Sequence, residues 1–203
     1  MSLDQIIAFY LFAVVAAVTP GPGNVLLTAT GAQAGLWRGL PCLLGVSSGA
    51  AALMFAAAAS LGGLMQLHPL LLQGMRIVGA AFLLWLAWKI ATAPVATDPA
   101  PAVPPRPVGF IGAALLQWVN PKVWMVAAGA VATYLPAGSG DEGLLVRAGV
   151  FALVFLAAAL PSGFVWLAFG AAAQRLLTDP RRQRIFNVAM GVILAGSVAL
   201  ILL

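Results

Sequence analysis

The segment Thr19-Pro20-Gly21-Pro22-Gly23-Asn24 interrupts a long apolar stretch near the beginning of this chain of 203 residues. Proline removes a backbone hydrogen-bond donor and glycine weakens a helix, so a helix is expected to stop in this segment. Further along the chain, Asn120-Pro121-Lys122 interrupts another apolar stretch in the same manner. Two interruptions of this kind indicate two broken helices.

Composition predicts that the chain is embedded in a membrane. Hydrophobic residues make up 63% of it and charged residues only 7%, which is unlike a soluble domain. Six apolar stretches are long enough for helices that cross a hydrocarbon core, which takes roughly 20 residues. They lie near residues 5–30, 40–65, 70–91, 109–135, 144–173 and 185–203. The predicted fold is an all-α integral membrane protein with six transmembrane helices.

A proline-rich segment divides the chain into two halves of three spans. Six prolines lie within residues 94–107, and this density excludes helix and favours an extended linker. We expect a single transmembrane domain over 1–203, with repeat 1 at about 1–93, a cytoplasmic linker at about 94–108 and repeat 2 at about 109–203. Because each half has three spans, the halves enter the membrane in opposite directions. Related halves would form two inverted repeats, with the first helix of each repeat broken.

Basic residues predict the orientation. Seven of the ten Lys and Arg residues fall in the loops after spans one, three and five, namely Arg38, Lys89, Arg106, Arg175, Arg181, Arg182 and Arg184. The positive-inside rule then predicts that both termini lie on the non-cytoplasmic side. So few cations, spread over membrane loops, favour a topology signal over nucleic-acid binding.

Each interruption contains a signal for starting a helix. Thr19 and Asn120 each stand directly before a proline, and Thr or Asn at the N-cap followed by Pro is a common helix start. We therefore predict that a new half-helix begins at Thr19 and another at Asn120. The alternative is two ordinary kinks without function. Broken helices at matching places in two halves are the best sequence pointer to a transporter binding site.

Lys122 is the sharpest single clue to a site. It lies near the centre of the fourth span, where an ionisable side chain costs roughly 2.5–3.5 kcal/mol to insert. The six spans contain no deep Asp or Glu that could pair with it, so its ammonium invites an anionic ligand such as a carboxylate. It could instead release its proton and take part in proton coupling, or snorkel towards an interface.

The other candidates surround the two breaks. Gln117, Asn120 and Trp124 are spaced as one helical face and could offer two amides and an aromatic wall, and Asn24 and Thr28 are spaced as another. Glycines leave backbone groups open to a ligand, and the start of a half-helix favours a negative group. A zwitterion would fit, with its carboxylate towards Lys122 or a half-helix start. The candidate substrate-binding residues are Thr19, Pro20, Gly21, Gly23, Asn24, Thr28, Gln117, Asn120, Pro121, Lys122 and Trp124.

Small residues predict close helix packing. Gly31-x-x-x-Gly35 and Gly45-x-x-x-Gly49 let helices approach closely, within the chain in preference to a homodimer interface. Ser47 and Ser48 are expected to form hydrogen bonds between helices. Pro161-Ser162-Gly163 predicts a kink in the fifth span that could line the pathway.

Enzyme chemistry has little support in the sequence. It contains no Ser-His-Asp set, no phosphate-binding loop and no metal-ligand spacing, so we expect no catalytic residue, no cofactor and no metal. The single cysteine, Cys42, cannot form an internal disulfide and argues against a thiol-disulfide electron carrier. Transport would then draw on an ion gradient.

These motifs resemble the LysE/RhtB family of amino-acid exporters. Further matches are Gly35 to Gly39, the Leu-Gly-x-x-x-Gly at 44–49, the segment 79–86, Asn187 and Gly191. The resemblance implies a secondary exporter of amino acids or related small metabolites in the bacterial inner membrane, with protons as the coupling ion and a midplane site between the broken helices. It carries over to Pro20, Gly21, Gly23, Asn24, Asn120, Pro121 and Lys122.

One departure from the family bears on the substrate. Many members carry an acidic residue deep in a later span, whereas the fifth span here reads Leu160-Pro161-Ser162-Gly163-Phe164. Export of a neutral amino acid is therefore more natural than export of doubly cationic lysine. A membrane-embedded redox or assembly factor and a passive channel of the same helical layout remain as alternatives.

Overall fold

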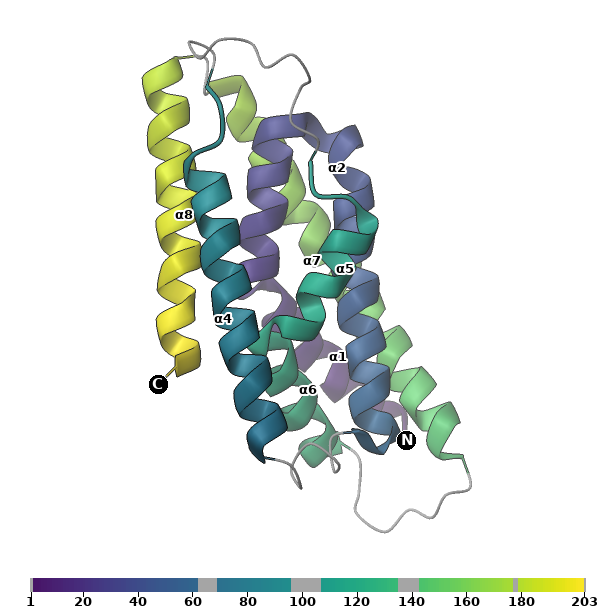
Figure 1. Cartoon of the computed structure of the whole chain (residues 1–203). Coiled ribbons are helices and arrows are strands. Elements are labelled where there is room, and N and C mark those ends of the chain that lie inside the picture. Colours follow the sequence, from purple (N-terminus) through teal and green to yellow (C-terminus); the bar gives the residue numbers. More distant parts are fainter. Residues whose placement is uncertain (1, 62–68, 96–106, 135–142, 177–178, 203) are drawn as a thin grey trace.

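The computed structural model describes residues 2–61, 69–95, 107–134, 143–176 and 179–202. Within these ranges the chain forms seven α-helices and one short π-helix, arranged as a bundle (Figure 1). They are α1 (Leu3–Val18), α2 (Pro22–Ala56), the π-helix η1 (Ala57–Leu61), α4 (Pro69–Ala91), α5 (Phe110–Val119), α6 (Pro121–Tyr134), α7 (Leu144–Leu176) and α8 (Pro180–Leu202). The all-α prediction is confirmed. Most of the predicted linker, residues 96–106, lies outside the described part of the chain.

The first break separates α1 from α2. Thr19 ends α1, because its N–H donates to the Val15 carbonyl at 3.0 Å and its hydroxyl donates to the same oxygen at 2.6 Å. α2 begins at Pro22, and Gly21 stands before it in an extended conformation as the N-cap. The interruption is confirmed, but the prediction that Thr19 starts the new half-helix is wrong. The Thr19 hydroxyl turns back to α1, so Gly21 and Pro22 start the second half-helix.

The second break separates α5 from α6 at Asn120. This residue is extended, with φ −87° and ψ 107°, and Pro121 is the first residue of α6. The Asn120 Oδ1 accepts a hydrogen bond from the Lys122 N–H at 3.1 Å. That bond is the usual contact between an N-cap side chain and the second residue of a helix. The predicted start of a half-helix at Asn120 is confirmed.

α2 is longer than predicted, because it joins the stretches at 5–30 and 40–65 without an intervening loop. The two helical parts of α2, residues 22–34 and 36–56, meet at Gly35, which has φ +79°. A residue with a side chain is strained in this left-handed region, whereas glycine is not. A single glycine therefore turns the chain where a loop was expected, and we call the two pieces the first and second parts of α2.

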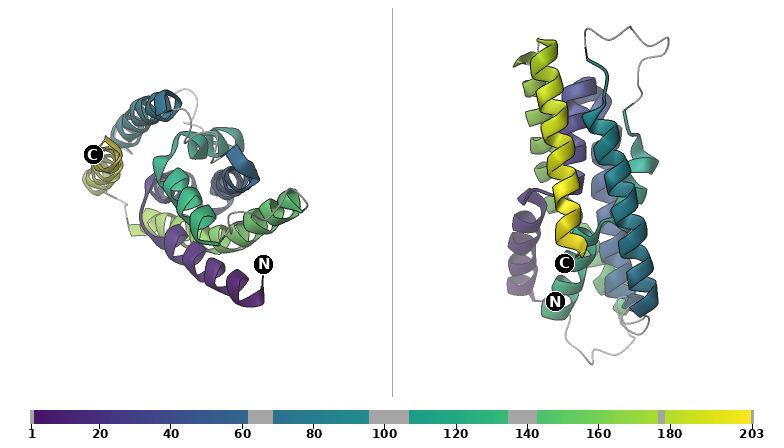
Figure 2. Two further views of the ribbon diagram at one scale, coloured as in Figure 1. Left: turned by 90° about the horizontal axis from the view of Figure 1, so that it is seen from below. Right: turned by 60° about the vertical axis from the view of Figure 1, so that its left-hand side comes forward.

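Two apolar clusters form the core. The first draws on α2, α4, α5, α7 and α8 and contains Leu43, Leu83 and Leu167. The second draws on α1, the second part of α2, α6 and α7, and within it the rings of Phe9 and Phe151 stack with centroids 4.3 Å apart. α2 and α7 contribute to both clusters and pack against each other. α4 and α8 lie side by side at one edge of the bundle (Figure 2).

Glycines set the closest helix contacts. A Cβ placed on Gly49 would lie 2.6 Å from the Ala114 carbonyl oxygen of α5, and one on Gly191 would lie 2.7 Å from the Ala87 carbonyl oxygen of α4. Gly45 likewise contacts the backbone of α5, and Gly31 contacts the backbone of α7. The predicted close packing within the chain is thus confirmed at three of the four glycines of the two pairs. The fourth, Gly35, forms the turn inside α2.

Two described helical stretches, Pro22–Ala59 and Leu144–Ala173, are long and apolar enough to cross a membrane, judged by length and composition alone. Leu3–Val18, Ala80–Ala91 and Phe110–Val119 are shorter apolar helices. α1 and α5 are short because each stops at a break, and each continues into the next helix after only one to three residues. The six spans stay a prediction.

The contact between α2 and α5 leads to a prediction about stability. Gly49→Ala would push a methyl group into the backbone of α5, so it should lower the free energy of unfolding by about 1–3 kcal/mol, as other overpacked sites do. Gly129→Ala in α6 is the matched control, since a Cβ there meets nothing within 4 Å. Thermal unfolding in detergent should show a lower midpoint for Gly49→Ala and an unchanged or higher one for Gly129→Ala. Equal midpoints would contradict the close packing.

Candidate functional site

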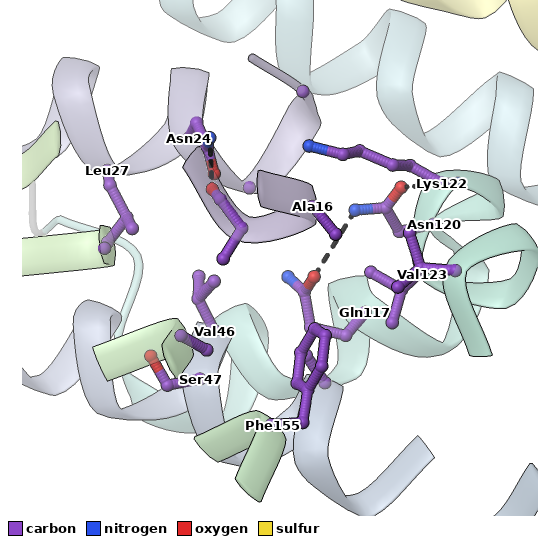
Figure 3. Close-up of a pocket in the computed structure, with 17 residues that line it drawn as sticks. Ala16, Asn24, Leu27, Val46, Ser47, Gln117, Asn120, Lys122, Val123 and Phe155 are labelled. Carbon is purple, nitrogen blue, oxygen red and sulfur yellow. Dashed lines mark hydrogen bonds between the residues drawn. The ribbon is translucent and has the colours of Figure 1, made fainter. Parts of the chain in front are cut away.

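The two breaks meet at one cavity. It has a volume of about 530 Å³, including the part that opens outward, and we call it the central cavity. α1, both parts of α2, α5, α6 and α7 line it. Its polar lining consists of Asn24, Ser47, Gln117, Asn120 and Lys122, together with the backbone of Gly21 and Gly23 (Figure 3). The cavity therefore gathers residues from both halves of the chain.

Asn24 holds the first break together. Its Nδ2 donates to the Ala17 and Thr19 carbonyl oxygens, both at 3.0 Å. These carbonyls belong to the end of α1, where the helix has no further N–H groups to offer them. A side chain near the start of α2 thus satisfies the end of α1 and fixes the angle at which the two helices meet.

The start of α2 is open towards the cavity. Its N-cap is Gly21, so no side chain makes a capping hydrogen bond there. The first N–H groups of a helix have no partner within the helix and carry a partial positive charge. Gly23 and Asn24, which are among these first residues, both line the cavity. This end of α2 is suited to a negatively charged group.

Lys122 bridges the two breaks. The side chain is partly buried, and its Nζ donates to the carbonyl oxygen of Thr19. Its stem lies against Gly21, where a Cβ would be only 2.6 Å from the Lys122 Cδ. The absence of a side chain at Gly21 lets the lysine cross from α6 to the start of α2. A positive charge and an open helix start therefore lie together.

Two buried amides form the wall beside Lys122. Gln117 and Asn120 are 1% and 2% exposed, and the Asn120 Nδ2 donates to the Gln117 Oε1 at 3.3 Å. The Gln117 Nε2 donates to the Ala113 carbonyl at 3.2 Å. This chain of hydrogen bonds links α5, the break and α6. It orients the amides that face the cavity before any ligand arrives.

The structure brings together six of the eleven predicted site residues. Those that line the cavity are Gly21, Gly23, Asn24, Gln117, Asn120 and Lys122; those that do not are Thr19, Pro20, Thr28, Pro121 and Trp124. The Thr28 hydroxyl donates to the Trp166 carbonyl of α7 at 3.4 Å. Thr19 still takes part through its carbonyl oxygen, which accepts from Lys122.

The expectation that Trp124 shares a helical face with Gln117 and Asn120 is wrong. The helix is interrupted at Asn120, so spacing counted across that residue does not predict a common face. The Trp124 Nε1 donates to the Trp118 carbonyl at 2.8 Å and so ties α6 to the end of α5. An aromatic ring does line the cavity, but it belongs to Phe155 of α7.

The sequence reasoning missed most of the contribution of α7 and all of that from the second part of α2. Phe155, Ala159 and Gly163 line the cavity from one face of α7, where their spacing of four residues was the available signal. Gly163 belongs to the Pro161-Ser162-Gly163 segment that the sequence predicts at the pathway, and α7 continues through Pro161. Ser47 also lines the cavity. Among the described residues, its Oγ is the one buried side-chain polar atom without a hydrogen-bond partner.

The expectation that Ser47 and Ser48 bond between helices is wrong for both. Ser48 is exposed and its hydroxyl donates within α2, to the Leu44 carbonyl at 2.6 Å. Ser47 is buried and lies near Gly163, which has no side chain to offer it a partner. Neither outcome could be read from the sequence, because both depend on which helix faces the second part of α2.

The site is suited to binding a small polar ligand. It offers an ammonium, three amides, a hydroxyl and an open helix start around an otherwise apolar space. In the ranges that the structure describes, no group of three His, Cys, Asp or Glu residues could hold a metal ion. The family model named LysE type translocator matches residues 14–203. The chain belongs to the LysE type translocator family.

Individual relatives within this group agree with the family model. The Escherichia coli strain K12 cysteine/O-acetylserine efflux protein is 30% identical over 194 residues, which is 92% of each chain. The protein of the same name from Salmonella typhimurium strain LT2 is 36% identical over 128 residues. That match spans 63% of this chain and 64% of the length of the Salmonella protein. No solved structure matches the chain.

Family membership decides two of the sequence predictions. The resemblance to the LysE family is confirmed, since the family model covers both halves of the chain and both breaks. A translocator family consists of transporters, so the prediction that the chain is not an enzyme is confirmed as well. The roles of individual residues in this LysE family protein stay predictions.

The first break leads to a prediction about Asn24. Asn24→Ala removes two hydrogen bonds from the end of α1, each of which contributes about 0.5–1.5 kcal/mol. The thermal midpoint in detergent should fall by several degrees. Thr92→Ala is the matched control, because its exposed hydroxyl bonds only within its own helix. If the two variants unfold at the same temperature, Asn24 does not hold the break together.

Proposed function

We propose that this LysE family protein is a secondary exporter of small neutral amino acids and related metabolites across the bacterial inner membrane. The observation that carries the proposal is the central cavity, in which an ammonium and an uncapped helix start lie together at the meeting point of two broken helices. Both attract a carboxylate. An amino acid is the simplest small metabolite that combines a carboxylate with a polar group of opposite charge.

The proposed binding pose exchanges one hydrogen bond for two contacts. The substrate carboxylate accepts hydrogen bonds from the Lys122 ammonium and from the first N–H groups of α2. Lys122 then leaves the Thr19 carbonyl, which becomes free to accept from the substrate ammonium. The carbonyl of Ala17, beside it, accepts only from Asn24 among the described bonds and could take a second donor. The unbound protein thus holds its own cation where the substrate ammonium would bind.

The charge of the site favours a neutral amino acid. All five acidic residues of the chain lie outside the six predicted spans, so no carboxylate is present there to receive a second positive charge. The names of the relatives, cysteine/O-acetylserine efflux protein, refer to substrates of this kind. Cysteine and O-acetylserine are therefore the first substrates to test, with serine and alanine as close analogues.

The proposed energy source is the proton gradient. The sequence contains no phosphate-binding loop of the kind that ATP-driven transport would need. A passive channel would let the substrate equilibrate without any gradient, which an assay can detect. A redox or assembly factor is disfavoured because Cys42, a residue of α2, is the only cysteine and lies buried in the first apolar cluster.

We also propose six spans as two inverted repeats, with both ends of the chain outside the cytoplasm. The helix contacts support this, because α5 packs on the second part of α2 as α1 packs on α7. Arg38 follows the turn of α2, Lys89 ends α4 and Arg181 begins α8. Figure 1 displays these three places at one end of the bundle and both chain ends towards the other. By the positive-inside rule, the first end faces the cytoplasm.

The decisive experiment measures efflux of labelled amino acids from loaded proteoliposomes, with and without a proton gradient. Lys122→Ala should lower efflux at least about tenfold, because a hydrogen bond to a charged group contributes about 1.5–3 kcal/mol. Lys89→Ala is the matched control, since Lys89 lies at the end of α4 over the Trp85 ring. It should transport like the wild type.

Two outcomes of this assay would contradict the proposal. Normal efflux by Lys122→Ala, with the protein present in the membrane, would remove Lys122 from the site. Equal efflux by wild-type protein with and without the gradient would favour a channel. Loss of efflux in both Lys122→Ala and Lys89→Ala would indicate that efflux depends on the total positive charge of the protein and not on the position of Lys122 in the cavity.

Topology has its own test by cysteine labelling in a Cys42→Ala background. Thr92→Cys at the end of α4 should react with a membrane-impermeant thiol reagent only when the cytoplasmic face is accessible. Leu145→Cys at the start of α7 should react from outside. Both positions are exposed. The opposite pattern would invert the proposed orientation, and labelling of both from one side would rule out the arrangement of spans.

A further inference from the structure

Ser47 is buried without a hydrogen-bond partner at the lining of the central cavity. Its side chain is 1% exposed and its Oγ bonds to nothing among the described residues. Buried hydroxyl groups are almost always paired, because leaving one unpaired forfeits its hydrogen bonds to water. An unpaired hydroxyl beside a cavity is a position for a ligand bond once rotation about the Ser47 Cα–Cβ bond turns the covered Oγ towards the cavity.

The neighbours of Ser47 explain why the protein itself does not pair it. Gly45 and Gly49 lie against the backbone of α5, and Ser48 points outward. Ser47 is two residues from each of these glycines, so it faces away from α5 and towards α7. On α7 it lies near Gly163, where a Cβ would stand 3.7 Å from the Ser47 Oγ. Because Gly163 has no side chain, it offers the hydroxyl neither a partner nor a covering group.

Ser47 and Lys122 lie at opposite sides of the lining, with Val46 beside Ser47 and Phe155 next to Gln117 (Figure 3). Lys122, the one charged side chain among the described lining residues, stands at the other side, where the two breaks meet. The Ser47 side is apolar apart from this one hydroxyl. A ligand with a charged head and a short, weakly polar tail matches this division.

We propose that Ser47 recognises the side chain of the exported amino acid, by a hydrogen bond to an uncharged hydroxyl, thiol or ester group. The inference rests on the proposed function, because it takes the substrate head group to lie at Lys122. It adds a substrate class: small amino acids whose side chain carries a neutral hydrogen-bonding group. An amino acid with a purely apolar side chain leaves the Ser47 hydroxyl unpaired and is exported less well.

Free serine and alanine provide the test, since they differ only in one hydroxyl. The ratio of serine efflux to alanine efflux is measured in proteoliposomes for wild type, Ser47→Ala and Ser48→Ala. We expect Ser47→Ala to lower this ratio about 3- to 10-fold, which corresponds to one net hydrogen bond. Ser48→Ala should leave it unchanged, because the Ser48 hydroxyl is bonded within its own helix. Removing an unpaired hydroxyl leaves no partner stranded, so Ser47→Ala should fold.

The failure of this inference can be separated from the failure of the proposed export. If wild-type protein exports both amino acids and Ser47→Ala keeps the wild-type ratio, the role of Ser47 is refuted while export stands. If wild-type protein exports neither amino acid, the proposed export of these substrates is refuted. The role of Ser47 is then tested by the rise in unfolding temperature that added serine causes. Stabilisation of wild type but not of Ser47→Ala would retain the contact. Equal stabilisation of wild type and Ser47→Ala, or stabilisation of neither protein, would refute the contact between Ser47 and serine.

Discussion

The rest of the site depends on one constraint: a helix broken inside an apolar environment must find new partners for the backbone groups that the break exposes. At the first break, the Asn24 amide and the Lys122 ammonium donate hydrogen bonds to the carbonyls at the end of α1. At the second, the Asn120 side chain caps the start of α6. Polar side chains are thereby required at the centre of an apolar bundle, and the proposed binding residues include those that stabilise the breaks.

Close packing brings these two breaks together. Glycines on the second part of α2 admit the backbone of α5, and glycines on its first part admit that of α7. α2 thus lies between the two helices and determines how far the breaks are from each other. Gly21 then leaves room for the Lys122 stem, so the cation of α6 reaches the start of α2. A larger residue at any of these places would separate the Lys122 ammonium from the start of α2, the two groups that the proposed carboxylate contact needs together.

Local chemistry made the breaks and most of their polar residues predictable, because proline and glycine act on the backbone wherever they stand. The exact start of α2 was not predictable, since Thr19-Pro20 and Gly21-Pro22 both offer a cap followed by proline. Trp124 was misplaced because a break resets the helical phase beyond it. Ser47 was misread for a different reason: its lack of a partner depends on Gly163 of α7, which lies far away in the sequence. Local patterns predict where a helix stops, but not which helix faces it.

The two halves contribute unequal parts to the site, and the proposed function requires this. Two identical repeats would present the same groups on both sides of the cavity, whereas an amino acid has a carboxylate, an ammonium and one side chain. Here the first half supplies an uncapped helix start and the carbonyls at the end of α1, and the second supplies the cation and a capped helix start. The same inequality continues across the cavity, where α2 offers a hydroxyl at Ser47 and α7 offers the bare backbone of Gly163. The proposed function therefore gives an asymmetric ligand one preferred orientation between the two broken helices.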